Sequence, residues 1–413
     1  MRLLHLADLH LGVENYGRLD PATGLNSRLQ DFLRCLDVSL DLALSESVDA
    51  VLLAGDVYKT PSPNPTWQRE FARRVQRLQA ANVPLVVIVG NHDTPASYGK
   101  ATSVDVFHAL ELPNLHIIRS PKLIQLPTRS SVLQVAGLPW PSRHHLRARD
   151  DARHLTQEQT LAKIRQLSID QIGTLADQVN PGSPAVLVAH VTAAEASLSG
   201  GERTAQIGLD PTIPTRSLAH PAFDYVALGH IHRHQSLNPD GSPPVVYSGS
   251  LERIDFGEAD EEKGFCVIDL DGRGRRGNAR WRFVTVPSRP MVNIEVEIPA
   301  SANPTDTVLE RLAAVNVKDA MVRVRYRVTE GQDRVDSRAV MAALEEAHHV
   351  VSISAVAVPQ QRLSRADISE DAEPLQALDS YLATRDELTP HHDRLRRAAA
   401  ALDLELSRSE SGA

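Results

Sequence analysis

Five short stretches of the sequence end an apolar run with side chains that could bind a metal ion. The runs "MRLLHLAD" and "DAVLLAGD", for example, each stop at an acid. The candidate ligands are carboxylates, imidazoles and one amide: Asp8 and His10 in "ADLHLG", Asp56 in "AGDVY", Asn91 in "GNHD", His190 in "VAHVT", and His230 and His232 in "GHIH". This set contains no thiolate, so it favours Mn²⁺ or iron over a structural zinc ion, with Zn²⁺ as an alternative.

The spacing of these residues suits two ions. Asp8 and His10 are two positions apart, so on an extended segment both point to the same side, with Cα atoms roughly 7 Å apart. Two ions about 3.5–4 Å apart share a bridging ligand, clamp a phosphate and activate a water for in-line displacement. Asp56, which alone ends the second run, is our candidate for the bridge. His92, beside a ligand, is the natural general acid for the departing oxygen.

A histidine at the end of a strand is, taken singly, more often a structural residue than a ligand. The chain has 17 histidines, and we interpret His5, His234 and the pairs at 144–145, 348–349 and 391–392 as structural. Coincidence explains five such strand ends in one chain poorly. We therefore predict that the five ends share one site.

The elements around these stretches alternate between strand and helix patterns. Apolar residues recur at helical spacing over 29–44 and again over 67–78, between short apolar runs. This order predicts an α/β fold with parallel strands covered by helices on both faces. Ligand sites in such sheets form at the carboxyl ends of strands, so the five ends should meet in one crevice. Runs within 115–140 and 244–286 are broken by Pro and Gly and predict antiparallel additions.

The pattern changes near Pro287, which divides the chain. "MVNIEVEI" and "VRVRYRV" alternate apolar and polar residues, as strands with one solvent-exposed face do. Helical patterns over 304–316 and 335–347 complete a small α+β domain, and a polar segment then leads to two short amphipathic helices. We predict domains at 1–286 and 287–358, with a linker and terminal helices at 359–413.

Composition limits the class of protein. The chain has 413 residues, a net charge of −8 and two cysteines, Cys35 and Cys266, without metal-ligand spacing. Such a chain suits a reducing compartment, and it carries no apolar run long enough for a membrane span. We predict a cytoplasmic protein without a membrane partner. The acidic balance means that any nucleic acid must be held by local basic clusters.

The same motifs, in the same order, resemble those of calcineurin-like metallophosphoesterases. "GGERTAQIG", "GHIHRHQ" and "VYSGSLERIDFGEADEEKGF" narrow the resemblance to the SbcD nuclease subunit family. It implies a sandwich of two mixed β-sheets flanked by helices, a small α+β capping domain and a C-terminal helical tail. It also implies a hydrolase: a double-strand DNA exonuclease and single-strand endonuclease, acting in end processing, recombination and repair.

The resemblance further implies a ligand set and partners. One ion would be held by Asp8, His10, Asp56 and His232, the other by Asp56, Asn91, His190 and His230, with His92 as acid. The family's two divalent ions are usually Mn²⁺. Its members act on DNA ends and bind SbcC, an ABC-type ATPase with a coiled coil. For the terminal helices the sequence alone leaves two alternatives, packing on the small domain or on another helix, and the resemblance implies that they bind the SbcC coiled coil. Family members form homodimers within a heterotetramer, here through helices near 65–82 and 98–110. The chain itself has no G-x-x-x-x-G-K-[ST] loop for ATP.

Two features depart from the family or stay open. Lys59 stands three residues after the bridging acid, where relatives carry Asp or His near the catalytic histidine, so Asp93 is a candidate substitute for orienting His92. Candidate DNA contacts lie in two basic clusters: Arg143, Arg147 and Arg149, and Arg323, Arg325 and Arg327. For each cluster alone, an ordinary solvated face is the simpler interpretation. The alternative functions are a small-molecule phosphodiesterase, or a scaffold for SbcC and DNA ends with weak nuclease activity.

Overall fold

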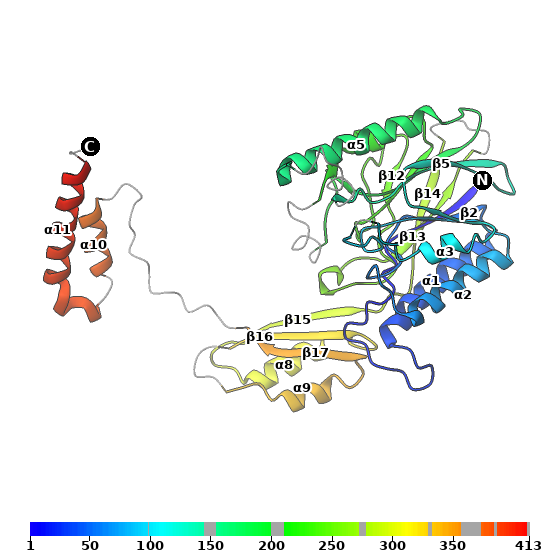
Figure 1. Cartoon of the computed structure of the whole chain (residues 1–413). Coiled ribbons are helices and arrows are strands. Elements are labelled where there is room, and N and C mark those ends of the chain that lie inside the picture. The colour runs from blue at the N-terminus through cyan, green and yellow to red at the C-terminus, as the bar shows by residue number, and fades with distance from the viewer. Residues whose placement is uncertain are drawn as a thin grey trace.

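A computed structural model of the chain describes residues 1–97, 99–143, 154–199, 210–271, 278–328, 333–356, 373–383 and 386–410. The chain up to Thr285 forms a sandwich of two six-stranded sheets, with helices on its outer faces (Figure 1). A smaller three-stranded sheet with two helices follows, and the chain ends in a pair of helices. The predicted fold class is confirmed.

The first sheet has the strand order β14-β13-β1-β2-β3-β4. Its strands are β1 (Arg2–Leu6), β2 (Ala50–Leu53), β3 (Leu85–Ile88), β4 (Leu115–Ile118), β13 (Gly264–Asp269) and β14 (Arg280–Thr285). β1 to β4 are parallel, while β13 and β14 pair antiparallel. The carboxyl ends of β1, β2 and β3 therefore lie at one edge of the sheet.

The second sheet has the order β11-β12-β10-β7-β6-β5. Its strands are β5 (Lys122–Pro127), β6 (Val132–Leu138), β7 (Ala185–His190), β10 (Tyr225–Gly229), β11 (Gln235–Ser236) and β12 (Val245–Tyr247). β6, β7, β10 and β12 are parallel. The antiparallel prediction for 115–140 and 244–286 is thus right for β5, β13 and β14 and wrong for β4, while β6 and β12 each have one antiparallel and one parallel neighbour. Strand periodicity reports which faces are buried and says nothing about strand direction.

A short parallel pair, β8 (Thr192–Ala193) and β9 (Thr212–Ile213), lies outside both sheets.

Three apolar layers hold the sandwich together. Between the sheets, residues such as Leu52 and Val86 of the first pack with Val188 and Ala227 of the second. The outer face of the first sheet is covered by α1 (Ser27–Ser45), α2 (Pro65–Ala80) and α3 (Asp105–Ala109), and that of the second by α5 (Gln157–Asp177) and α7 (Thr215–Leu218). Because both faces of each sheet are covered, the central strands are mostly apolar, whereas the edge strands β5, β11 and β14 carry polar residues.

The helices begin where their sequences supply caps. The Asn64 side chain accepts hydrogen bonds from the backbone N–H groups of Thr66 and Trp67, and Pro65 occupies the first turn of α2. Thr156 and Gln159 form a reciprocal capping box at the start of α5. These caps satisfy N–H groups that have no partner within a helix, and they fix where each crossover turns back onto its sheet.

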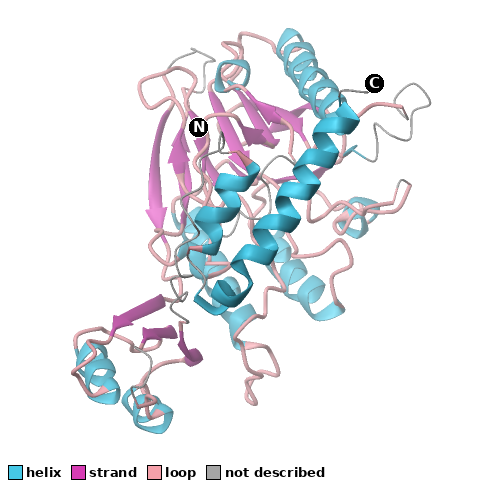
Figure 2. Cartoon of the chain, turned by 90° about the vertical axis from the view of Figure 1, so that its left-hand side faces the viewer, coloured by secondary structure: helices cyan, strands magenta, loops and turns pink. Residues whose placement is uncertain are grey.

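The small domain is a parallel sheet with helices on one face. β15 (Met291–Glu297), β16 (Met321–Arg327) and β17 (His349–Ala355) alternate with α8 (Pro304–Ala313) and α9 (Ser337–Ala343). Ile294, Val308 and Val324 are among its buried core residues. Figure 2 shows this domain at lower left, with its three strands nearer the sandwich and its helices farther away. The exposed face that the alternation predicts is therefore the helix-free one.

A network of buried charges joins the small domain to the sandwich. The Arg289 guanidinium donates to both carboxylate oxygens of Asp31 on α1, at 2.5 and 2.6 Å. The Arg289 backbone N–H donates to Glu252, and the Arg253 guanidinium donates to the carbonyl of Arg289. Burial alone would raise the pKa of Asp31, but Arg289 and Arg28 hold it below its usual value. Charged hydrogen bonds therefore fix the small domain to residues 252–253.

The chain ends with α10 (Pro374–Leu382), the 3₁₀ helix η3 (Asp386–His391) and α11 (His392–Glu410). The Arg396 guanidinium on α11 pairs with Asp379 on α10 at 2.9 Å. Tyr381 and Leu402 are exposed, and Figure 1 draws these helices apart from the two domains. Among the described residues, no helix is long and apolar enough to cross a membrane.

Candidate metal centre

The seven predicted ligands come from the carboxyl ends of strands in both sheets. Asp8 and His10 follow β1, Asp56 follows β2 and Asn91 follows β3, all in the first sheet. His190 ends β7, and His230 and His232 follow β10, both in the second. The crevice thus lies where the parallel strands of the two sheets end side by side. A further link joins them, because the His230 backbone N–H donates to both carboxylate oxygens of Asp8, at 3.0 and 3.1 Å.

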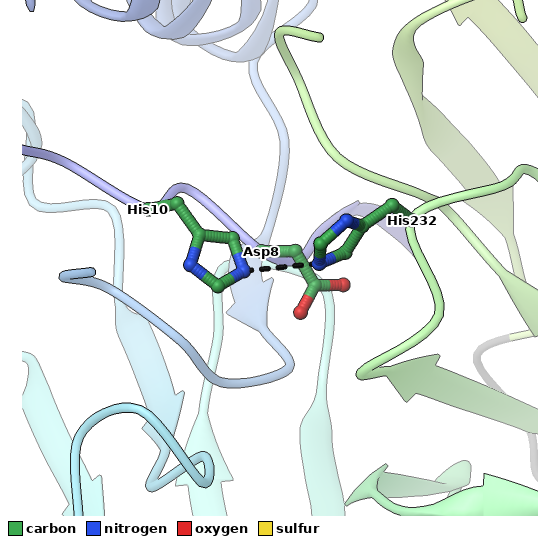
Figure 3. A group of neighbouring side chains, drawn as sticks. All are labelled: Asp8, His10 and His232. Carbon is green, nitrogen blue, oxygen red and sulfur yellow. Dashed lines mark hydrogen bonds between the residues drawn. The ribbon is translucent and has the colours of Figure 1, made fainter. Parts of the chain in front are cut away.

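Asp8, His10 and His232 form the first group of candidate ligands, with one ligand atom of each within 4.8 Å of the others. Figure 3 shows the two imidazoles facing each other across Asp8. Their Nε2 atoms are 3.1 Å apart. The His232 Nδ1–H donates to the Glu258 carboxylate, so in a neutral ring the Nε2 of His232 carries a lone pair. That lone pair and the Asp8 carboxylate suit a cation.

The second group has its donor atoms directed at a common point. The Nδ1–H of His190 donates to the carbonyl of Ala54 at 2.7 Å, which leaves its Nε2 facing the Asn91 amide oxygen at 2.8 Å. The Nε2 of His230 faces the Asp210 carboxylate at 3.3 Å, while its Nδ1 lies 3.0 Å from the same amide oxygen. With neutral rings, two nitrogen lone pairs and a carbonyl oxygen would face one another. A divalent cation satisfies all three, so these residues fit a metal site.

Asp56 lies between the two groups. Its Oδ2 atom is 3.6 Å from His10 Nε2 and 3.4 Å from His190 Nε2. Its other oxygen accepts a hydrogen bond from the His92 backbone N–H at 2.9 Å. One oxygen is thus fixed to the protein and the other faces histidines of both groups. This is the placement that a bridging carboxylate requires.

The charges of the site show how a metal would be accommodated. Burial raises the pKa of Asp8 to about 7. Burial also lowers the pKa of His10 and His230. The pKa of His190 instead rises to about 9, because Asp56 and Asp8 outweigh the effect of its burial. Without an ion, protons must therefore neutralise part of this cluster, and a metal ion would displace them.

The backbone at the ligands is strained. Asp8, His10, Asp56 and His230 have φ values of 53°, 42°, 54° and 100°. Non-glycine residues rarely adopt positive φ, and such strain persists only where the surroundings impose it, commonly at functional sites. Four positive values among seven candidate ligands indicate that the backbone is bent to direct these side chains inward.

Glycines at the strand ends leave room for the ligands. A Cβ atom at Gly55 would lie 2.2 Å from His190 Nδ1, and one at Gly90 would lie 2.0 Å from an Asp56 oxygen. At Gly229, which ends β10 just before His230, a Cβ atom would lie 2.0 Å from the Ala54 carbonyl oxygen. The strand ends of the two sheets can approach this closely only without side chains at these positions.

We expect Gly229→Ala to lower the free energy of unfolding by about 1–3 kcal/mol, because the added methyl group must displace backbone in a packed region. Equilibrium urea unfolding measures this change. Gly173→Ala on α5 is the matched control, since a Cβ atom there meets nothing within 4 Å. It should stabilise the helix by about 0.5–1 kcal/mol. Equal stabilities for the two variants would contradict the close packing at Gly229.

His92 is exposed beside the buried cluster, and its orientation comes from the backbone. Its Nδ1–H donates to the carbonyl oxygen of Lys59 at 2.9 Å. Its ring meets the edge of the His10 ring, with centroids 4.8 Å apart. The Lys59 side chain is therefore not needed to hold His92, and any residue at position 59 could supply the same carbonyl.

Asp93 does not orient His92, contrary to the suggestion from the sequence. It is fully buried and accepts hydrogen bonds from the backbone N–H groups of Val57, Tyr58 and Gly90 and from the Ser103 hydroxyl. Adjacent side chains on this segment point apart, and that of Asp93 points into the protein. It ties the loop after β2 to the loop after β3.

Three residues near the site are not predicted by the sequence. Asp210 faces His230, the Trp140 ring lies 4.7 Å from the His230 ring, and Glu258 faces His232. Glu258 lies in the "SGSLERIDFGE" run, which carries the family resemblance without a role assigned to any of its residues. Asp210 follows "GGERTAQIG" without ligand spacing, and Trp140 resembles an ordinary core aromatic. No local pattern marks either of them.

The candidate DNA contacts differ in their surroundings. Arg143 lines a cleft of about 290 Å³ together with the ligand Asn91 and with Trp140. Arg147 and Arg149 lie outside the described residues. The guanidinium of Arg323 lies 4.2 Å from the centre of the Phe256 ring. Arg325 pairs with Glu295, and Arg327 pairs with Glu297. Of the described candidates, Arg143 is therefore the one next to the metal ligands, where it lies 4.0 Å from the Asp210 carboxylate, and the charges of Arg325 and Arg327 are likewise partnered.

Curated proteins and solved structures resemble this chain, and three of them serve as examples. The SbcD subunit of nuclease SbcCD from Bacillus subtilis (strain 168) is 28% identical over 338 residues, which cover 80% of this chain and 80% of that protein. Its counterpart from Escherichia coli (strain K12) is 32% identical over 279 residues, which cover 64% of this chain and 63% of that protein. The solved structure is a dimetal phosphatase from Danio rerio. The match covers 69% of this chain and 99% of that protein, at 11% identity and a TM-score of 0.37.

A family match covers more than half of the chain. Residues 1–234 match the family described as calcineurin-like phosphoesterase, a stretch that contains all seven candidate ligands and His92. The resemblance predicted from the sequence is confirmed by this match and by the two curated relatives. The chain belongs to the calcineurin-like phosphoesterase family.

Proposed function

We propose that this chain is a metal-dependent DNA nuclease, the catalytic subunit of an SbcCD-type complex that processes DNA ends in recombination and repair. The observation that carries the proposal is the convergence of metal-ligand side chains around Asp56, in a chain whose curated relatives are nuclease subunits. The activities proposed are double-strand exonuclease and single-strand endonuclease, both hydrolyses of phosphodiester bonds.

We assign the ligands of the two ions as the family resemblance implies. Asp8, His10, Asp56 and His232 would hold one ion, and Asp56, Asn91, His190 and His230 the other. The grouping is supported by the facing Nε2 atoms of His10 and His232 and by the shared approach of His190 and His230 to Asn91. We propose Mn²⁺ as the physiological ion, because imidazole, carboxylate and amide oxygen without thiolate suit it.

The residues of the chain divide the chemistry among them. The two ions, when bound, supply an activated water and stabilise charge on the phosphate during in-line displacement. Asp56, whose Oδ2 atom faces histidines of both groups, would hold both ions. His92 gives its Nε2 proton to the leaving sugar oxygen, as a general acid. The Lys59 carbonyl keeps the Nδ1 proton of His92 in place and stabilises the ring while both nitrogens carry protons.

The partners follow from the relatives and from exposed apolar residues. SbcC would supply ATP hydrolysis, since this sequence has no phosphate-binding loop of the Walker type. We propose that α10 and α11, which expose Tyr381 and Leu402, bind its coiled coil. Val106 and Leu110, on and just after α3, are exposed and support a homodimer through this region and α2. The complex would act on DNA ends in the cytoplasm, at the nucleoid.

Digestion of end-labelled linear duplex tests the proposal. The purified chain, with and without SbcC, is incubated with Mn²⁺, with Mg²⁺ or with a chelator. We expect cleavage with Mn²⁺ and none with the chelator. Cyclic nucleotides in parallel reactions test the small-molecule alternative. Hydrolysis of cyclic nucleotides with intact duplex would favour a phosphodiesterase, and DNA binding without cleavage under any metal would favour a scaffold.

A further inference from the structure

We propose that Glu258, held by Lys263, is a positioning residue that orients His232 toward the first ion. This inference rests on the proposed metal centre and extends it beyond the residues matched by the family, which end at 234. The Nδ1–H of His232 donates to Glu258 Oε1 at 2.8 Å. An ionised carboxylate only accepts hydrogen bonds, so it places the proton of the neutral ring on Nδ1 and the lone pair on Nε2.

Glu258 is itself fixed by two further contacts. Its Oε2 atom accepts the Ile254 backbone N–H at 3.0 Å and lies 2.7 Å from the Lys263 ammonium group. Glu258 and Lys263 are both 2% exposed. The carboxylate therefore cannot turn away from His232 without leaving a buried cation and a buried N–H group without this partner, which is costly.

Lys263 contacts both Glu258 and the backbone of His232. Its ammonium group donates to the His232 carbonyl at 3.1 Å as well as binding Glu258. The backbone and the ring of His232 are thus held by the same ion pair. A buried lysine–glutamate pair can serve the stability of the fold alone. This pair, however, contacts both the backbone carbonyl and the ring of the same candidate ligand, which a purely structural pair does not require.

Two other imidazoles of the site, those of His190 and His230, have comparable partners. His190 donates to the Ala54 carbonyl and His230 faces Asp210. The corresponding partner of His232 is Glu258, in the short 3₁₀ helix η2 (Phe256–Glu258). The "SGSLERIDFGE" run, which the proposed function left without a role, therefore supplies the support of the first metal position.

Glu258→Gln tests the inference, because glutamine keeps the size of the side chain and loses its charge. Glu261 still pairs with Lys263 at 2.9 Å in this variant, which favours folding. Titration of the metal-free protein with Mn²⁺, followed by calorimetry and by the electron paramagnetic resonance of free Mn²⁺, should show one ion bound about 10–100-fold more weakly. The other ion should bind as in the wild type. Glu262→Gln, an exposed change of the same charge on the same loop, should bind both ions normally.

The outcomes separate this inference from the proposed metal centre. If the wild-type protein binds no pair of ions, the metal centre itself fails. If wild type and Glu258→Gln bind both ions equally well, Glu258 does not position His232. Should Glu258→Gln fail to fold, the double variant Glu258→Gln with Lys263→Met removes both buried charges and takes its place. A folded double variant with two tight ions would overturn the inference, and one with a single weakened ion would support it.

Discussion

Replacing Asp56 by asparagine should lower the rate of DNA hydrolysis by about 10³-fold or more. The carboxylate faces histidines of both ligand groups, so its loss removes a ligand from each ion and the charge that holds them together. Two-ion clamping contributes several kcal/mol of transition-state stabilisation, and each 1.36 kcal/mol is about a factor of ten in rate. Hydrolysis of end-labelled duplex at saturating Mn²⁺ gives the measurement.

Metal binding by the same variant supplies a second readout. Ions that bind only the folded state raise the midpoint of thermal unfolding, by an amount equivalent to about 2.7 kcal/mol at one hundred times the dissociation constant. Mn²⁺ should raise the midpoint for the wild type and much less for Asp56→Asn. Asp240→Asn, an exposed change of the same kind, should behave as the wild type. An Asp56→Asn protein that is stabilised by Mn²⁺ as strongly as the wild type would show that Asp56 is not the bridge.

Changing His92 to glutamine should lower turnover about 10²–10⁴-fold while both ions stay bound, since a general acid contributes that much to a rate. His92 is exposed and anchored through Nδ1 to the Lys59 carbonyl, so its Nε2 is available to the substrate. Single-turnover cleavage of duplex measures the rate, and Mn²⁺ titration counts the ions. His154→Gln, on an exposed residue, is the control. Loss of an ion from His92→Gln would make His92 a ligand instead.

The sequence predicted the convergence of strand ends because that convergence follows from a general property of parallel sheets. Asp8, Asp56 and Asn91 follow strands of one sheet, whereas His190 and His230 come from the other. Local periodicity cannot assign strands to sheets, so only the family resemblance, and not the pattern of residues, implied that two sheets contribute. The prediction of one shared crevice still holds, although the ligands come from two sheets, because both sheets end at the same edge of the sandwich.

The supports of the ligands could not be predicted for a different reason. The contact between His92 and the Lys59 carbonyl involves a backbone group, which carries no signature in the residue type. Asp210 and Glu258 reach their histidines across 20 and 26 residues of chain, through loops whose paths no pattern specifies. Such contacts depend on the completed fold.

Strand register explains why the arginine stripe of the small domain was open to two interpretations. Arg325 and Arg327 lie opposite Glu295 and Glu297 in the parallel pairing of β15 with β16. Both alternating patterns were visible in the sequence, but which residues stand opposite each other depends on how the strands align. A shift of two residues would have left an arginine without its acidic partner.

The segment from Glu252 to Lys263 contacts both the small domain and the candidate metal centre. Glu252 and Arg253 form hydrogen bonds with Arg289 at the start of the small domain. A few residues later, Glu258 accepts a hydrogen bond from the candidate ligand His232. A displacement of the small domain would therefore act on the same segment that carries Glu258, the partner of the candidate ligand His232.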